Sequence, residues 1–312
     1  MYKEEDCVTL FLARTIPVLK QIGSYEIIFC LDPSPDRTEQ IIRAEAEGNP
    51  DIKLIRLSRR FGQPSATMAG ILNATGRSIV VIDADLQDPP ELIPDLYRKL
   101  CEGVDVVFAK RRSRLGTTWS RKLVSILGYR LIASIADVDI PRNTGDFRIM
   151  SRRVVEDLRH LPEGHGFLRG LVAFVGYQQA ALEFDRADRA AGRSKYNRIT
   201  GPFRIAFNGV FGFSTVPLSV LLWLGLLICA ASFALIVGVV VKKLIIGEAY
   251  PLGIPTIMVL VLFLGGMQLA ALGVIGEYIG RIYNDVRRRP LYNIDEAVNL
   301  VPRAQFGPIA HD

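Results

Sequence analysis

Cysteine and histidine are scarce in this chain of 312 residues, which has 4 cysteines and 3 histidines. The cysteines lie far apart and form no Cys-X-X-Cys pair, and the histidines show none of the spacings typical of metal ligands. We therefore expect neither a disulfide framework nor a zinc site. The cysteines are interpreted as small buried hydrophobic side chains in a reducing compartment.

Nothing at the N-terminus of the sequence resembles a secretory signal, and we find no internal repeat or low-complexity tract. Its first residues, Met1–Asp6, are polar and acidic, unlike the apolar core of a signal peptide. We expect the large polar part of the chain to stay in the cytoplasm.

Charge is absent from two long stretches. Residues 216–241 contain no charged side chain in 26 positions, and residues 254–276 contain none in 23. About 20 apolar residues cross a bilayer, whereas helices of soluble proteins nearly always have a polar face. The pattern predicts two transmembrane helices, at 216–241 and 254–277, and the alternative is two buried core helices.

Basic residues are concentrated before the first stretch and after the second, against only Lys242 and Lys243 between them. Because basic residues accumulate on the untranslocated side, both ends of the hairpin are expected in the cytoplasm. The net charge of +6 suits a face held against anionic lipid. Nucleic acid is the competing partner, and we discount it because no nucleic-acid motif accompanies the basic residues.

The polar part alternates between strand-like and helix-like segments, which predicts a mostly parallel sheet covered by helices. Residues 199–213 carry four phenylalanines around Arg204 and suit helices in the membrane interface, or else a core helix. Strands are expected at 25–31, 52–57, 78–83, 104–109 and 178–184, helices at 37–47, 65–74 and 90–101, and a loop at 186–197.

An acidic turn follows the hydrophobic run 78–83. Acids at the carboxyl end of a buried strand lie where open α/β sheets bind ligands. Alternate carboxylates with a nearby amide oxygen, as in Asp83, Asp85 and Gln87, suit a divalent cation that bridges to a diphosphate. The alternative is that Asp85 or Asp88 only caps the helix that begins near Pro90.

Six motifs in this order, with the hairpin, resemble the polyprenyl-phosphate glycosyltransferases of glycosyltransferase family 2. This group includes relatives of dolichol-phosphate mannose synthase and the bactoprenol glucosyltransferases, and the resemblance covers nearly the whole chain. The motifs are residues 2–5, 32–36, 83–91, 143–148, 194–196 and 276–281.

The resemblance implies a Rossmann-like α/β domain of the GT-A type at residues 1–197. Interfacial amphipathic helices at 198–215 would follow, then the two-helix transmembrane hairpin and a cytoplasmic tail at 278–312. Such an enzyme is a multi-pass protein of the inner (plasma) membrane, and the family suggests a homotetramer.

The implied reaction moves one sugar from a nucleotide-diphosphate sugar to undecaprenyl phosphate with inversion, for glycosylation of the cell envelope. UDP-glucose is the donor that the bactoprenol group suggests. A catalytically silent membrane anchor is the alternative from another class. A processive polysaccharide synthase is disfavoured, because the chain lacks a Gln-X-X-Arg-Trp motif and further membrane helices.

The resemblance also implies roles on the donor side of the site. Asp85 and Gln87 would hold Mg²⁺ or Mn²⁺ against the donor diphosphate, and Asp83 would help to position the nucleotide. A cation there neutralises the charge that grows on the leaving group.

Asp32 matches the acid that contacts the base or ribose of the donor in this family, and Tyr2 and Glu4 match more loosely. The sequence has Pro33 where the family commonly has glycine. Because proline cannot adopt a positive φ, we expect a reshaped donor loop.

On the acceptor side, a phosphate monoester is already largely ionised at neutral pH, so cationic positioning matters more than a strong base. The basic stretches 110–114 and 120–122 supply such charge. Arg111 and Arg121 match the paired arginines of the family, and arginine suits bidentate phosphate contacts.

Asp146 lies in a segment interpreted as a turn and close to the acceptor in related enzymes. It would act as a base, orient the phosphate through Arg148, or only hold Arg148 in place. Lys195 would close over bound substrates and exclude water. Asp85, Asp146 and Arg121 are the residues expected to be catalytic.

Family members usually begin with a hydrophobic strand that leads into the motif at residues 2–5. Here that motif comes directly after Met1. We therefore expect either a sheet without one of its strands or a start site upstream of Met1.

Overall fold

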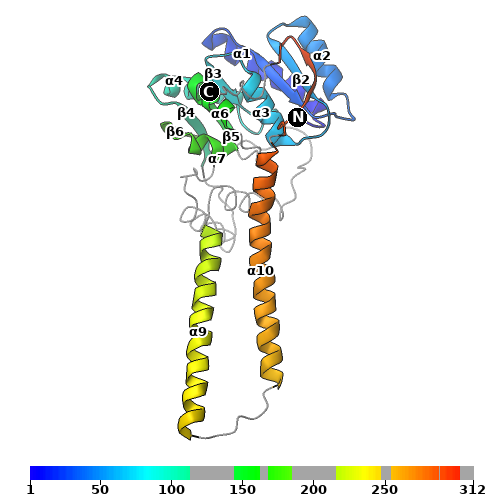
Figure 1. Ribbon diagram of the computed structural model, residues 1–312. Helices are drawn as coiled ribbons and strands as arrows, with labels where there is room; N and C mark the ends of the chain where they lie inside the picture. The colour runs from blue at the N-terminus through cyan, green and yellow to red at the C-terminus, as the bar shows by residue number, and fades with distance from the viewer. Residues whose placement is uncertain (113–143, 162–167, 185–215, 247–253, 288, 303–312) are drawn as a thin grey trace, which may run out of the picture.

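The computed structural model describes residues 1–112, 144–161, 168–184, 216–246, 254–287 and 289–302. An α/β domain lies at one end of the molecule, and two long helices extend away from it side by side (Figure 1). The strands of the domain form two sheets.

The first sheet contains β1 (Ile27–Leu31), β2 (Ile52–Leu57) and β7 (Ile294–Val298), in the order β1-β2-β7. β1 and β2 are parallel, and β7 is antiparallel to β2. The expected strands at 25–31 and 52–57 are confirmed. β7 was missed, because residues 278–312 were interpreted as a tail.

The second sheet has the order β3-β5-β4-β6, from β3 (Ser78–Val81), β4 (Val106–Arg111), β5 (Thr144–Ser151) and β6 (Gln179–Phe184). β5 is antiparallel to β3 and β4, and β4 is parallel to β6. The prediction of one mostly parallel sheet is wrong, since both sheets are mixed. The interpretation of the segment around Asp146 as a turn is also wrong, because it begins β5.

Helix α1 (Glu5–Ile22) was not expected, although its apolar residues recur every three or four positions. Its buried Val8, Phe11 and Leu12 pack in one cluster with Phe29 of β1. The other helices of the domain are α2 (Thr38–Gly48), α3 (Gln63–Asn73), η1 (Pro90–Leu92), α4 (Ile93–Cys101), α6 (Arg152–His160) and α7 (Leu168–Phe174).

The two charge-free stretches lie in helices α9 (Val216–Ile246) and α10 (Ile254–Val286), of 31 and 33 residues. Large apolar side chains such as Trp223 and Leu269 are exposed on them. By length and composition, one stretch within the described residues is able to cross a membrane, Phe263–Val286, and Val216–Gly225 is a shorter apolar stretch. The two-helix hairpin remains a prediction.

After α10 the chain returns to the α/β domain, where residues 289–298 pack against it. Tyr292 is fully buried, and its hydroxyl accepts a hydrogen bond from Asn73 Nδ2 at 3.1 Å. In β7, Glu296 binds both terminal nitrogens of Arg43, one of them at 2.7 Å. The residues expected to form a tail therefore anchor α10 to the domain.

Candidate active site

The expected donor residues meet at one edge of the domain, where β1 and β3 end. Asp32 follows β1, and Asp83, Asp85 and Gln87 follow β3. They line the same cavity of 1340 Å³. Tyr2, Glu4, Arg60, Gln63, Asp146 and Arg169 also line it.

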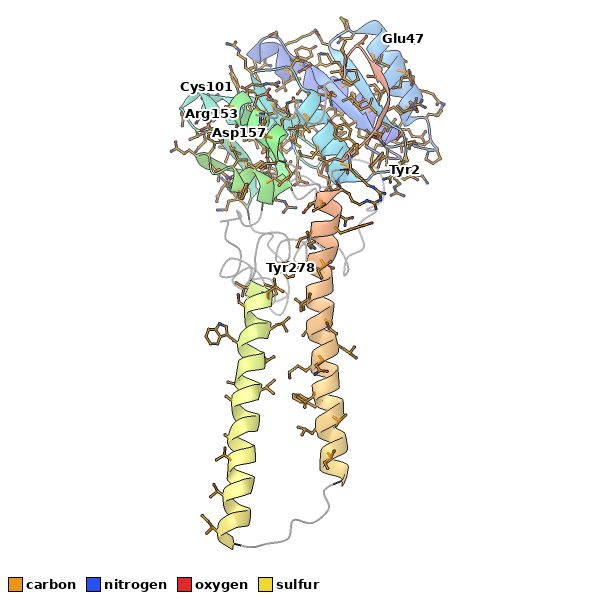
Figure 2. All side chains as sticks on the ribbon, viewed as in Figure 1. Tyr2, Glu47, Cys101, Arg153, Asp157 and Tyr278 are labelled. Atoms are coloured by element: carbon orange, nitrogen blue, oxygen red, sulfur yellow. The ribbon has the colours of Figure 1, made fainter. Side chains whose placement is uncertain are left out.

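The long helices approach the domain on the side of its N-terminal motif. Tyr2, which lines the cavity, lies on the side of the domain to which α10 extends, whereas Glu47, near the end of α2, lies on the far side (Figure 2). The part of the cavity wall that this motif forms is therefore on the same side of the domain as the long helices.

Two carboxylates face each other across neighbouring strands. Val81 of β3 pairs with Arg148 of β5, and the same antiparallel register continued beyond β3 sets Asp83 opposite Asp146. Burial raises the pKa of Asp83 to about 6, and the negative charges of Asp146 and Asp85 add to the shift. Gln63 Nε2 donates a hydrogen bond to Asp83 Oδ1 at 3.1 Å. Such a concentration of negative charge favours a bound cation.

The turn that carries Asp85 and Gln87 is held by its middle residue. Leu86 has a φ of 59°, in the left-handed region that residues other than glycine rarely adopt. Its side chain is buried in the cluster formed with Val8 and Phe11 of α1. The Gln87 N–H donates to Asp85 Oδ1 at 3.1 Å.

The residues at the N-cap positions of η1 and α4, Pro89 and Leu92, make no side-chain capping hydrogen bond. The alternative that Asp85 or Asp88 caps the helix near Pro90 stays a prediction.

The residues around this turn fit a metal ion whose coordination is completed by the substrate. Within the described part of the chain, no group of three or more His, Cys, Asp or Glu side chains could hold a metal alone. Mg²⁺ commonly takes one or two carboxylates together with substrate phosphates, rather than a full set of protein ligands. The Asp85 carboxylate and the Gln87 amide oxygen match that pattern.

Asp146 is paired with arginines. Its Oδ1 lies 3.2 Å from Arg169 Nε of α7 and 3.9 Å from Arg148 Nη2. The Arg148 guanidinium is buried and donates to the carbonyls of Gly145, at 3.1 Å, and Asp146, at 3.3 Å. Burial lowers the pKa of Arg148 to about 10. Through these contacts, Arg148 stabilises the backbone at the start of β5.

Arg169 is the residue that sequence reasoning missed. It lies in a helix of the cavity wall, and its guanidinium binds the expected catalytic carboxylate. No motif quoted above includes it. Only the contact between α7 and the start of β5 brings it to the site.

Asp32 is buried, and both of its carboxylate oxygens accept backbone hydrogen bonds, from Phe61 N–H at 3.1 Å and Gly62 N–H at 2.9 Å. Gly62 has a φ of 93°, which favours glycine. Asp32 thus holds the loop between β2 and α3. Its contact with a donor base or ribose remains a prediction.

The N-terminal motif lies beside this loop. The Arg60 guanidinium is 4.2 Å from the centre of the Tyr2 ring, within cation–π range. The Glu4 N–H donates to Thr38 Oγ1 at 2.9 Å, and Thr38 Oγ1 donates to Asp36 Oδ2 at 2.7 Å. The loop that contains Pro33 is thereby tied to the start of α1.

Much of the expected acceptor site lies outside the described residues, including Arg121 and Lys195. Arg111 ends β4, and only its backbone is described. Lys110 Nζ forms an ion pair with Glu183 Oε1 at 3.0 Å. The positive charge of Lys110, which lies in the described part of the basic stretch, is therefore paired with a carboxylate of the neighbouring strand β6.

An acidic site at the carboxyl ends of strands is typical of α/β enzymes, which bind their ligands at this edge of the sheet. The profile described as "Glycosyl transferase family 2" matches residues 2–159. The chain belongs to glycosyltransferase family 2. It is a transferase with a GT-A-like glycosyltransferase fold of mixed sheets.

Similar proteins cover nearly the whole chain. The uncharacterized glycosyltransferase sll0501 of Synechocystis sp. is 44% identical over 301 residues, which are 96% of this chain and 94% of that protein. The SfII prophage-derived bactoprenol glucosyl transferase of Shigella flexneri is 39% identical over 95% of this chain and 96% of its own. The solved mannosyltransferase PcManGT of Pyrobaculum calidifontis, in complex with GDP-Man and Mn²⁺, is 18% identical with a TM-score of 0.45, covering 92% and 85% of the two chains.

Proposed function

We propose that this enzyme transfers a single sugar from a nucleotide-diphosphate sugar to the phosphate of a membrane polyprenyl phosphate. The observation that carries the proposal is the acidic cluster of Asp83, Asp85 and Asp146. These residues line one cavity with Tyr2, and Tyr2 lies on the side of the domain to which α10 extends. The near full-length similarity to a bactoprenol glucosyl transferase supports undecaprenyl phosphate as acceptor and UDP-glucose as donor.

On the donor side, Asp85 and Gln87 would hold Mg²⁺ or Mn²⁺, with the diphosphate oxygens completing the coordination. When bound, such a cation neutralises the charge that develops on the leaving nucleoside diphosphate. Asp83 and Asp32 would position the nucleotide, the first from the cavity wall and the second through the loop at Phe61 and Gly62.

In the transfer, an oxygen of the acceptor phosphate attacks the anomeric carbon on the face opposite the diphosphate. One carbon–oxygen bond forms and the bond to the nucleoside diphosphate breaks, so the configuration inverts. The acceptor oxygen is already largely deprotonated at neutral pH, because the second pKa of a phosphate monoester is about 6. Asp146 is then better suited to holding Arg169 toward the two anionic substrates than to removing a proton.

The acceptor carries its phosphate at the membrane surface, and the long helices would hold the site there. α9 and α10 form the proposed hairpin, with spans at 216–241 and 254–277 and both ends of the chain in the cytoplasm. Their exposed apolar side chains support this arrangement. Residues 198–215 would lie in the interface, with Arg111, Arg121 and Lys195 available for phosphate, and the family suggests a homotetramer in the plasma membrane.

The experiment is a transfer assay on the full chain in detergent. Undecaprenyl phosphate, Mg²⁺ or Mn²⁺ and a panel of nucleotide sugars are supplied, and the lipid-linked sugar is measured. Asp85→Asn is the test variant. Asp95→Asn is the matched control, because Asp95 is an exposed acid on α4 that pairs with Arg98.

We expect product from one donor, lost with EDTA, restored by added metal and reduced at least about 100-fold in Asp85→Asn but not in Asp95→Asn. Product that survives both EDTA and Asp85→Asn would overturn the assigned metal role. No product from any donor, with folded protein, would favour the silent anchor.

A further inference from the structure

Four exposed arginines lie where the domain meets the end of α10. They are Arg59, Arg60, Arg287 and Arg289, and we call them the junction arginines. The first two belong to the loop between β2 and α3, and the other two follow α10. These segments are joined by a hydrogen bond from the Ser58 N–H to the Asn293 carbonyl at 2.9 Å. Arginines from distant parts of the sequence are thus brought to one side of the domain.

The positive charge of the junction arginines is not balanced by neighbouring acids. Among the described residues, no carboxylate forms an ion pair with any of the four. The Arg59 guanidinium lies instead 3.9 Å from the centre of the Phe61 ring. Asp295, a carboxylate near the start of β7, is bound by Arg56 at 2.6 Å. The junction therefore keeps a net positive charge that an anion can neutralise.

Apolar and aromatic side chains are exposed at the same end of α10. Ile282, Tyr283 and Val286 are 59%, 57% and 73% exposed. The Arg287 guanidinium lies 5.1 Å from the centre of the Tyr283 ring. Tyrosine beside arginine at the end of an apolar helix is typical of the interface between a membrane and water. This combination of exposed surfaces fits a lipid surface better than a soluble anion.

The position of the junction along α10 agrees with this reading. The stretch of α10 that is able to cross a membrane ends at Val286, directly before Arg287. The proposed span ends earlier, at residue 277, which is about 15 Å from Arg287 along the helix. That distance is about the thickness of one headgroup layer plus one Debye length. With either boundary, the junction arginines are within electrostatic reach of lipid headgroups.

The loop that carries Arg59 and Arg60 also forms part of the cavity wall. Arg60 and Gly62 line the cavity. The N–H groups of Phe61 and Gly62 donate to the buried Asp32 carboxylate, at 3.1 and 2.9 Å. A headgroup bound by the arginines would therefore restrain the same backbone that Asp32 holds.

We propose that the junction arginines bind the headgroups of anionic phospholipids, and that this contact holds loop 58–62 at the membrane surface. The lipid would then stabilise the part of the cavity wall to which Asp32 is bound. Basic side chains near an anionic membrane surface each add to the attraction, so four of them on one side of the domain act together. The inference rests on the insertion of α10 in the membrane, which is part of the proposed function.

The test uses the full chain in nanodiscs of phosphatidylcholine, either alone or with about one third phosphatidylglycerol. The test variant combines Arg59→Gln with Arg289→Gln, neither of which lines the cavity. The matched control combines Arg98→Gln with Lys99→Gln and removes two positive charges from α4. Cys101, the last residue of α4, lies across the domain from Tyr2 (Figure 2).

Amide hydrogen exchange at residues 59–62 is the measurement, and it does not depend on turnover. We expect anionic nanodiscs to slow this exchange by a factor on the order of ten relative to neutral ones. In 1 M NaCl the difference should disappear, because the Debye length falls to about 3 Å. The test variant should lose most of the difference, and the α4 control should keep it.

Equal exchange in neutral and anionic nanodiscs, or a difference that the test variant keeps, would overturn the proposal. Inorganic phosphate is added to neutral nanodiscs in a separate arm. If it slows exchange as much as the anionic lipid does, the junction binds a soluble anion and the assignment to lipid is wrong. A folded chain that enters neither kind of nanodisc would overturn the insertion of α10, and this proposal with it. A failed transfer assay would leave the exchange result unchanged.

Discussion

Replacing Leu86 by alanine and by glycine tests whether the turn between Asp85 and Gln87 is strained. At most buried positions alanine is the less damaging of these two substitutions. At Leu86 we expect this advantage of alanine to disappear, because the backbone there has a φ of 59°.

Both substitutions remove the branched end of a side chain that is 3% exposed, at a cost of about 2–5 kcal/mol. Alanine keeps a further cost of about 1–2 kcal/mol for the left-handed conformation, which glycine avoids. Glycine instead loses about 0.5–1 kcal/mol through its greater freedom in the unfolded chain, and about 0.8 kcal/mol because it also removes the buried Cβ. These opposing contributions nearly cancel, so Leu86→Gly and Leu86→Ala should agree in stability to within about 0.5 kcal/mol.

Leu96 provides the control, because it is fully buried in helix α4. There glycine should be less stable than alanine by about 1 kcal/mol. Thermal unfolding of the full chain in detergent measures both pairs, at about 2–4 °C per kcal/mol for a domain of this size. If Leu86→Ala proves the more stable variant by as much as Leu96→Ala does, the strain at Leu86 is refuted.

Three further predictions concern the anchored C-terminal segment and the site. Tyr292→Phe should lower stability by about 0.5–1.5 kcal/mol at neutral pH. Burial raises the pKa of Tyr292 to about 12, so the free energy of unfolding should fall as pH rises from about 10 to 12. Thermal unfolding at alkaline pH should show a smaller fall in Tyr292→Phe, which has no hydroxyl to ionise. Arg43→Met should lower the free energy of unfolding by about 1 kcal/mol at low salt and by less in 1 M NaCl, because its partner Glu296 is partly exposed and salt screens the ion pair. A difference in Tm that does not change with salt would contradict this. Arg169→Ala should reduce turnover by about 10²-fold with partial recovery in Arg169→Lys, whereas equal turnover in both would separate Arg169 from the acidic site.

Local pattern predicted much of the fold. The strands β1, β2, β3, β4 and β6 and the helices α2, α3 and α4 were predicted correctly, because periodicity and turn residues act over a few neighbouring positions. The two long helices followed from the absence of charge. The acidic turn after β3 was recognisable for the same reason, since its residues are consecutive.

The pairing of distant segments could not be predicted in this way. Asp146 lies opposite Asp83 only because β5 is antiparallel to β3, and Arg169 reaches it only through the packing of α7. Neither contact leaves a sign in the local sequence. The role of Asp32 as the anchor of the loop at Gly62 likewise depends on a contact across 30 positions.

The sequence by itself determined the family, the class of enzyme, most of the helices and strands, and several of the carboxylates that line the cavity. Tertiary structure alone decided that the described strands divide into two mixed sheets and that β7 follows α10 and joins the first of them. The reason is physical: strand order and direction are set by backbone hydrogen bonds between segments far apart in the chain, which residue periodicity does not encode.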